Sequence, residues 1–135
     1  NTTPMKKCIL LLIIPFLSFG QNKTNSFQEL DENFRSDSSF TGIGYSFYEN
    51  GQIEIMAKFT NGDYKVGNSF YLEFSETGQV EYEEYYQDGK LYLERGVIRN
   101  GPGKGGRWER QYKNGKLHKE FQWNQDGIRE FYHLE

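Results

Sequence analysis

One short phrase occurs three times in this chain. It reads Phe47-Tyr48-Glu49-Asn50-Gly51-Gln52-Ile53, then Phe74-Ser75-Glu76-Thr77-Gly78-Gln79-Val80, then Gln111-Tyr112-Lys113-Asn114-Gly115-Lys116-Leu117. Each copy is followed by an aromatic residue and a second polar-Gly pair: Asn61-Gly62, Asp88-Gly89 or Asp126-Gly127. Such spacing is typical of repeat architectures. We therefore expect a repeat domain, a class that more often binds partners or serves as a scaffold than catalyses.

The segments between these turns have the length and alternation of β-strands. Asn-Gly and Asp-Gly favour the tight turns of hairpins, because both residues accept positive φ. After the first turn, four apolar residues fall on one face of a strand: Ile53, Ile55, Ala57 and Phe59. This period of two predicts antiparallel strands with one packed side. Glu84 and Lys119 interrupt the apolar face in the later copies, so they face each other or a sheet edge, or those strands are out of register by one residue.

The spacing changes between the second and third copies. The distance from Gly78 to Gly115 exceeds that from Gly51 to Gly78, and we assign the excess to an additional hairpin-like unit over 90–101 and to a glycine-rich segment over 102–106. This segment does not match a phosphate-binding loop, because Lys104 is followed by glycine and no helical pattern comes after it. We expect a flexible loop between hairpins.

The N-terminal region has the pattern of a secretory signal peptide over residues 5–20. Met5-Lys6-Lys7 is basic, Ile9 to Phe19 is largely apolar, and the run is too short for a comfortable membrane span. An uncleaved N-terminal anchor is the alternative. Residues 1–4 precede the natural-looking start at Met5, and we exclude them from the fold. We expect an exported protein that is periplasmic, associated with the outer membrane, or secreted.

Residues 21–40 are polar and predict a tether ahead of the repeat domain, 41–135. Within the tether, Ser26-Phe27-Gln28-Glu29 fits a helix capping box, and Phe27, Leu30 and Phe34 follow at helical spacing. A short N-terminal helix over about 27–35 and a disordered linker both remain open.

Composition limits the remaining classes of function. The chain has 135 residues, which predicts one domain. Its one cysteine, Cys8, precedes most of the apolar run, so we expect neither lipidation nor a disulfide. The formal net charge is −3 and becomes more negative once Lys6 and Lys7 are removed. This balance disfavours nucleic-acid binding, which depends on neutralising phosphates.

The repeated phrase, a strand, and a second Asp/Asn-Gly turn together resemble the MORN-repeat-variant family of bacteria, many of whose members are labelled antitoxins. The resemblance covers roughly residues 41–135. It implies an all-β fold, an antiparallel meander of repeated β-hairpins forming an elongated, twisted single sheet. The chain departs from the pattern in its 102–106 insert and in lacking the Leu-x-Gly end of a typical copy. The resemblance is more specific for fold than for function.

Charge is the most informative surface feature of the repeat domain. Acidic residues dominate from Glu73 to Glu94, and basic residues dominate from Arg95 to Lys119. Adjacent hairpins of opposite sign pair across strands, or they form a bipolar surface that steers a charged protein. With the two tryptophans, these residues give the candidate partner surface: Glu81, Glu83, Glu84, Arg99, Lys104, Arg107, Trp108, Arg110, Lys113 and Trp123.

No arrangement of residues indicates catalysis, a cofactor or a metal site. His118 and His133 are the only histidines, and no serine lies in a nucleophile-like turn. Glu81, Glu83 and Glu84 cannot converge as paired acids if they alternate between faces. The sequence favours a non-catalytic protein-binding or scaffolding protein of the bacterial cell envelope. The alternatives are an antitoxin or immunity protein that masks a toxin, and a protein that binds an envelope glycan or lipid headgroup through exposed aromatic residues.

Overall fold

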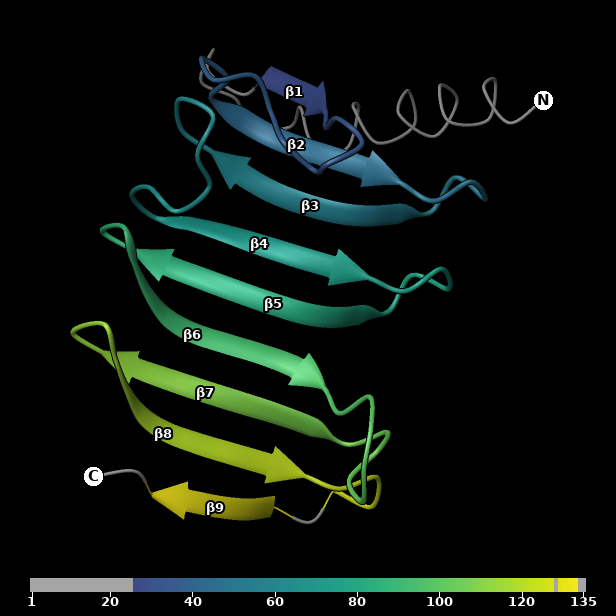
Figure 1. The fold of residues 1–135 in the computed structure, drawn as a ribbon, viewed down its shortest axis with the longest axis vertical. Helices are drawn as coiled ribbons and strands as arrows, with labels where there is room; N and C mark the ends of the chain where they lie inside the picture. The colour runs from purple at the N-terminus through teal and green to yellow at the C-terminus, as the bar shows by residue number, and fades with distance from the viewer. Residues whose placement is uncertain (1–25, 128, 134–135) are drawn as a thin grey trace, which may run out of the picture.

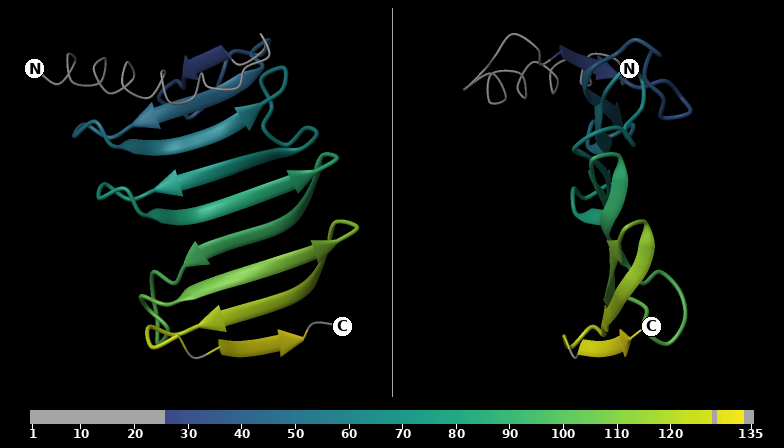
Figure 2. Two further views of the ribbon diagram at one scale, coloured as in Figure 1. Left: turned by 180° about the vertical axis from the view of Figure 1, so that it is seen from behind. Right: turned by 90° about the vertical axis from the view of Figure 1, so that its left-hand side faces the viewer.

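The computed structural model describes residues 26–127 and 129–133, with side chains over 27–127. Within these residues the chain forms one sheet of nine strands in sequence order (Figure 1). The strands are β1 (Ser26–Glu29), β2 (Gly42–Phe47), β3 (Ile53–Phe59), β4 (Ser69–Phe74), β5 (Val80–Gln87), β6 (Lys90–Val97), β7 (Arg107–Lys113), β8 (Lys116–Trp123) and β9 (Arg129–His133). Seen edge-on, the sheet is a single twisted layer with loops at its sides (Figure 2).

The antiparallel meander predicted from the repeats is confirmed for β2 to β9. Each of these strands pairs antiparallel with the next. Strand β1 differs, because it pairs parallel with β2, which makes the sheet mixed. The connection from β1 to β2 is therefore long enough to return along the sheet, as a parallel pair requires.

Two kinds of turn alternate along the sheet, and each kind has its own edge (Figure 1). The left edge carries the two-residue turns between β5 and β6 and between β7 and β8, and also the longer connection from β3 to β4, which begins with a tight turn at Asn61-Gly62. In each of these tight turns both central residues have positive φ, such as 50° at Asp88 and 73° at Gly89. This is the geometry of a type I′ hairpin turn. Long turns lie at the right edge; in the first, the Gly51 amide donates to Tyr48 O at 2.9 Å and the Tyr48 amide donates to Gln52 O at 2.8 Å.

The third copy of the repeated phrase belongs to the other kind of turn. Gly51 and Gly78 lie in long turns, whereas Asn114-Gly115 is a short turn between β7 and β8, with φ of 52° and 75°. Residues 90–101 are therefore no addition to the repeat, because they contain β6, a regular member of the meander. Only the glycine-rich segment is extra, and it lengthens the turn from β6 to β7. Both kinds of turn require glycine after a polar residue, so the phrase alone does not distinguish them.

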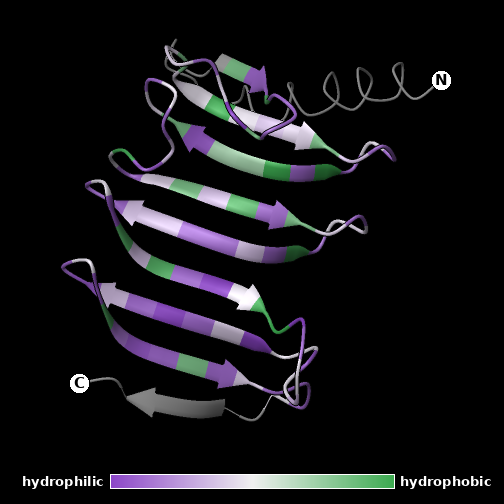
Figure 3. Cartoon of the chain, viewed as in Figure 1, coloured by the Kyte–Doolittle hydropathy of each residue, from purple (hydrophilic) through white to green (hydrophobic). Residues whose placement is uncertain are grey.

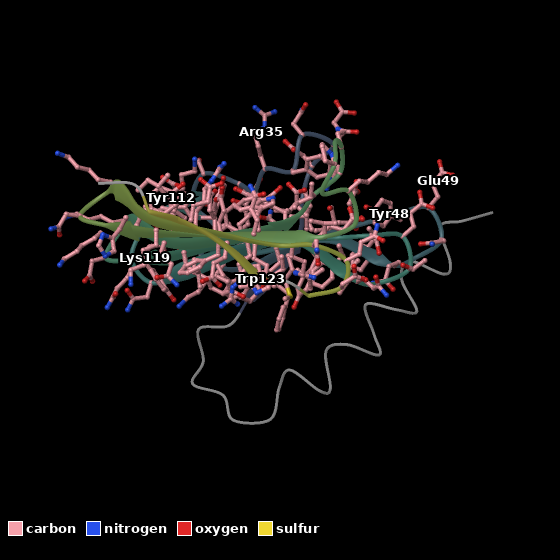
Figure 4. The ribbon with its side chains drawn as sticks, turned by 90° about the horizontal axis from the view of Figure 1, so that it is seen from below. Arg35, Tyr48, Glu49, Tyr112, Lys119 and Trp123 are labelled. Carbon is pink, nitrogen blue, oxygen red and sulfur yellow. The ribbon has the colours of Figure 1, made fainter. Side chains whose placement is uncertain are left out.

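The two faces of the sheet are called front and rear. Arg35 and Tyr112 point to the front, and Lys119 and Trp123 point to the rear (Figure 4). Cross-strand pairing then assigns Ala57, Tyr71 and Glu84 to the front, since they are direct partners. Phe121 and Trp123 of the third copy lie instead on the rear and share that face with Lys119, as predicted, whereas Leu117 lies opposite Tyr112 beyond a bulge. Lys119 and Glu84 occupy opposite faces, so the alternative that they face each other is wrong.

Bulges explain why the alternation fails near the long turns. The pairing register shifts by one residue between Ser46 and Phe47 and again between Glu73 and Phe74. Such a shift leaves one extra residue in the partner strand and bends it. Ile53 and Val80, which follow the two turns, therefore leave the face that their sequence position predicts.

The apolar core lies on the front face of the N-terminal strands. Hydropathy is highest along β2 to β4, while β7 and β8 are mostly polar (Figure 3). Four residues form the buried cluster: Leu30, Ile55, Ala57 and Phe59. Phe40, Tyr64 and Tyr71 pack against this cluster from the loops and from β4. The core is thin, as expected for a sheet with few aliphatic residues and no second layer.

Residues 26–40 belong to this core and do not form the helix considered over about 27–35. Ser26–Glu29 is strand β1, and the Leu30 amide continues the pairing by donating to Tyr45 O at 2.7 Å. Leu30 fills the space above Gly44. A helix cannot continue through Phe34, whose φ is 60°. The polar segment expected as a tether therefore covers part of the front face; the predicted signal peptide lies outside the described residues.

We predict that Gly62→Ala destabilises the protein more than Gly115→Ala. Both glycines have positive φ, at 77° and 75°, and alanine there costs about 1–2 kcal/mol. A Cβ at position 62 would also lie 2.6 Å from Ser38 Cα, whereas at position 115 nothing lies within 4 Å. Crowding adds about 1–3 kcal/mol at Gly62 alone. Urea unfolding measures both changes, and equal losses would show that residues 37–38 do not pack on this turn.

Candidate functional site

Most of the opposed charges pair with each other across strands. Arg95 Nε lies 2.7 Å from Glu109 Oε1, and Arg99 Nη2 lies 3.2 Å from Glu81 Oε2. Arg107 Nη2 approaches Glu83 Oε2 at 3.8 Å. The cross-strand account of the acidic and basic segments is therefore confirmed for Arg99 and Arg107, whereas Arg95 pairs with Glu109, the one acid of the basic segment itself. Exposed pairs of this kind contribute little stability each, but they fix which strands lie together.

The candidate partner residues do not form one continuous surface. By register, Glu84, Trp108 and Arg110 share the front face, while Glu83, Arg107 and Trp123 share the rear. Glu81 and Arg99 lie near the right edge, close to Glu73. Lys113 borders a short turn at the opposite edge, and Lys104 lies in the glycine-rich turn. Glu83 and Glu84 point to opposite faces, as predicted, and cannot converge as paired acids.

A hydrogen-bonded network of tyrosines and glutamates occupies the front face of β5 to β8. Glu84 and Glu94 are direct cross-strand partners, and Glu94 is only 8% exposed. Tyr86 Oη donates to Glu84 Oε2 at 2.6 Å, and Tyr112 Oη donates to Glu94 Oε1. Like charges directly opposite each other are unfavourable, so these donors are needed to hold the two carboxylates at one place.

Tyr82 and Arg110 join the two carboxylates to their surroundings. Tyr82 Oη lies 2.7 Å from Glu84 Oε1 and 3.0 Å from Glu94 Oε2, so a single phenolic proton faces two acceptors. Burial, followed by the bonds to both glutamates, raises the pKa of Tyr82 far above its ordinary value. Arg110 supplies the positive charge, with Nη1 at 3.4 Å from Glu94 and Nε at 3.4 Å from Glu120.

A line of aromatic rings connects this network to the apolar core. Tyr64 lies 4.9 Å from Tyr71 between ring centroids, Tyr71 lies 6.4 Å from Tyr82, and Tyr82 lies 6.0 Å from Trp108. The guanidinium of Arg110 stands 4.9 Å above the Trp108 ring. Gly96 makes room for that ring, since a Cβ there would lie 2.6 Å from it. The front aromatic residues are therefore part of the fold.

One hollow of the described surface lies toward the C-terminal end of the sheet. It has a volume of about 560 Å³ and lies among Glu83, Arg95, Arg107, Glu109 and Trp123. Gly105, Gly106, Trp108, Asn124, Gln125 and Gly127 complete its border. The side chains of Glu83, Arg95, Arg107, Glu109 and Trp123 belong to the rear face, whereas Trp108 borders the hollow from a front-face position of β7. The hollow thus combines two ion pairs with an indole ring, and it unites part of the predicted surface.

The sequence could not identify all residues of these two sites. Arg95 and Glu109 reach the hollow because β6 and β7 pair in a particular register, and no motif marks that register. The front network has a local signal, since Tyr82, Glu84 and Tyr86 alternate on one face of β5. Its partners, Glu94 and Tyr112, come from strands that lie beside β5 only in the fold.

The described residues contain neither a metal-binding cluster nor a helix that could cross a membrane. Among them, no three or more His, Cys, Asp or Glu side chains are grouped so that they could hold a metal ion. His118 is exposed on β8. Residues 26–127 and 129–133 contain no helix that is long and apolar enough to cross a membrane.

The repeats identify the family. The profile of the MORN repeat variant matches residues 40–61, 71–88 and 104–125. The chain carries three MORN repeat variants. The third match begins as far before Gly115 as the first begins before Gly51, although the structure places these glycines in turns of different kinds. MORN repeats generally bind proteins or membranes, and the family is generally non-catalytic. No curated protein matches the chain.

We predict that Tyr82→Phe lowers the free energy of unfolding by about 1–2 kcal/mol, because one donor to the paired glutamates is lost. Tyr92→Phe is the matched control: Tyr92 is 43% exposed, and its hydroxyl makes no hydrogen bond within the described residues. The free energy of unfolding of the Tyr92→Phe variant should fall by no more than about 0.5 kcal/mol. Urea unfolding of both variants measures the difference, and equal effects would contradict the network.

We also predict that stability falls above pH 10. Burial, then a bonded glutamate, raises the pKa of Tyr85 and that of Tyr112 to about 12, from an ordinary 10.0. Between these values the folded chain retains protons that the unfolded chain releases, so the free energy of unfolding decreases as pH rises through this window. Phenolate absorbance should therefore rise later in the folded chain than in the chain unfolded by urea. Coincident titrations would disprove the assignment.

Proposed function

We propose that this MORN-repeat protein is a non-catalytic protein-binding or scaffolding protein of the bacterial cell envelope, and that it binds its partner through the rear hollow. The observation that carries the proposal is the hollow itself, with about 560 Å³ bordered by two ion pairs and Trp123. That volume lies in the range of ligand-binding depressions. Tryptophan and arginine are the residues that most often dominate binding energy at protein interfaces.

The charges of the hollow favour a protein partner with both signs of charge. Arg107 is 50% exposed and lies 3.8 Å from Glu83, which is too long for a strong hydrogen bond. Its guanidinium therefore keeps donors free for a second carboxylate. Arg95 and Glu109 are joined more tightly, at 2.7 Å. Exposed charges of opposite sign set orientation and the rate of encounter more than they set affinity.

The envelope location rests on the sequence of residues 5–20, which has the basic, apolar and small-residue order of an export signal. Masking of a toxin and binding of a glycan or lipid headgroup remain the competing functions. A toxin would be a protein partner of known activity, whereas a glycan or a lipid would bind without any protein. These three are therefore separable by one set of binding assays.

We predict that Arg107→Glu weakens partner binding and that Lys113→Glu does not. Both residues are exposed on β7 and both changes alter the net charge equally, but only Arg107 borders the hollow. Immobilised wild-type protein and the two variants are incubated with envelope extract at low salt. Each captured protein is then purified, and its affinity for the wild-type protein and for each of the two variants is measured by titration.

Support requires a purified partner whose affinity falls at least about tenfold with Arg107→Glu, the scale of one charge-assisted contact, and is unchanged with Lys113→Glu. The affinity of the wild-type protein for that partner should also fall when salt is added. Equal binding by the two variants would remove the hollow as the site. Binding only to phospholipid vesicles, or only to an envelope polysaccharide, would replace the proposal by the corresponding alternative.

A further inference from the structure

Four Asn-Gly pairs in the chain share one chemistry. Their asparagines are Asn50, Asn61, Asn100 and Asn114. In such a pair, the glycine amide nitrogen attacks the asparagine side-chain carbonyl carbon, and ammonia leaves as a five-membered succinimide forms. Water then opens the ring at either carbonyl and gives aspartate or isoaspartate. Glycine offers the least steric hindrance, so local structure decides which pair reacts.

Hydrogen bonds on both reacting groups protect the first pair. Asn50 Nδ2 donates to Glu76 O at 3.1 Å, and Asn50 Oδ1 accepts the Gln52 amide at 2.9 Å. The attacking nitrogen, that of Gly51, donates to Tyr48 O at 2.9 Å, and Gly51 is buried. Ring closure at Asn50 must break these bonds, and each net hydrogen bond opposes it by about 1 kcal/mol.

Packing protects the second pair, and turn geometry slows the fourth. The Gly62 amide donates to Phe40 O at 2.8 Å, and the backbone of Ser38 lies directly against Gly62. Asn114 is exposed, but it is held at a φ of 52° in a two-residue turn that the pairing of Lys113 with Lys116 closes. Attack there requires the turn to open first.

The third pair has none of these restraints. Within the described residues, neither the Asn100 side chain nor the Gly101 amide makes a hydrogen bond. A Cβ built on Gly101 meets nothing within 4 Å, and Asn100 and Gly101 are both exposed. The surrounding turn is anchored at its base, where the Ile98 amide donates to Gly106 O at 2.8 Å. Asn100 thus lies on the part of the turn that can rearrange without breaking the sheet.

We propose that Asn100 is a site of spontaneous deamidation and isoaspartate formation in the folded protein. The product adds a carboxylate next to Arg99, whose guanidinium lies 3.2 Å from Glu81 Oε2 and 3.8 Å from Glu73 Oε2. Isoaspartate also adds one backbone atom to the turn from β6 to β7. The modification therefore changes the charge and length of this turn and leaves the strands intact.

The experiment ages the full chain in mildly alkaline buffer and digests it after glutamate. Such cleavage places the four asparagines on separate peptides, 50–54, 55–73, 95–109 and 110–120, and mass spectrometry follows the replacement of amide by acid in each. Asn100 should react at least about tenfold faster than Asn50 or Asn61, since each of these must lose more than one hydrogen bond or packing contact. In the urea-unfolded chain the four rates should converge.

Two variants give an independent readout by isoelectric focusing. Asn100→Gln should remove the early acidic shift of the intact protein, because glutamine must close a larger ring. Asn61→Gln, the matched control, should leave that shift unchanged. Equal rates at the four sites of the folded chain would overturn the proposal. So would an Asn100 that stays intact in the folded chain but reacts when it is unfolded.

Discussion

The hydrogen bonds between tyrosine hydroxyls and Glu84 and Glu94 hold together the half of the sheet that has no apolar core. The N-terminal strands can bury Ile55, Ala57 and Phe59 beneath Leu30, but no such cluster exists over β5 to β8 in the described residues. There the front face buries aromatic rings and satisfies the carboxylates between them with phenolic donors. A buried carboxylate is costly unless it is paired, so the removal of one donor affects the neighbours of both glutamates.

The same constraint explains which parts of the fold could be predicted from the sequence. Turns are local, and the Asn-Gly and Asp-Gly pairs predict each tight turn because few other residues accept its φ values. Whether the third copy forms a short or a long turn is not determined by its local sequence. Gly115 follows a phrase like that of Gly51, and only the bond from the Tyr48 amide to Gln52 O distinguishes the long turn, since a bulge lies beside both turns. The prediction of a polar tether for residues 26–40 is wrong for a related reason. Leu30 gains its packing partners only when Gly44 and Phe59 lie beneath it in the folded sheet.

The candidate surface was predictable in composition but not in arrangement. Runs of acids and bases indicate that the acidic and basic hairpins attract, and the ion pairs of Arg99 and Arg107 agree with this. Which face each charge occupies depends on one-residue shifts at the bulges, and these leave little trace in the sequence. The rear hollow contains Trp123, which the sequence singled out, together with Arg95 and Glu109, which it did not.

Each strand of this sheet contacts the strands before and after it and, among the described elements, little else. Forces applied to such a structure are carried in series from hairpin to hairpin. Insertion or removal of one hairpin, with a short turn at one end and a long turn at the other, would leave the remaining contacts as they are. The length of the protein is therefore an adjustable property, and a lineage could match it to the distance between two attachment points without redesigning a core.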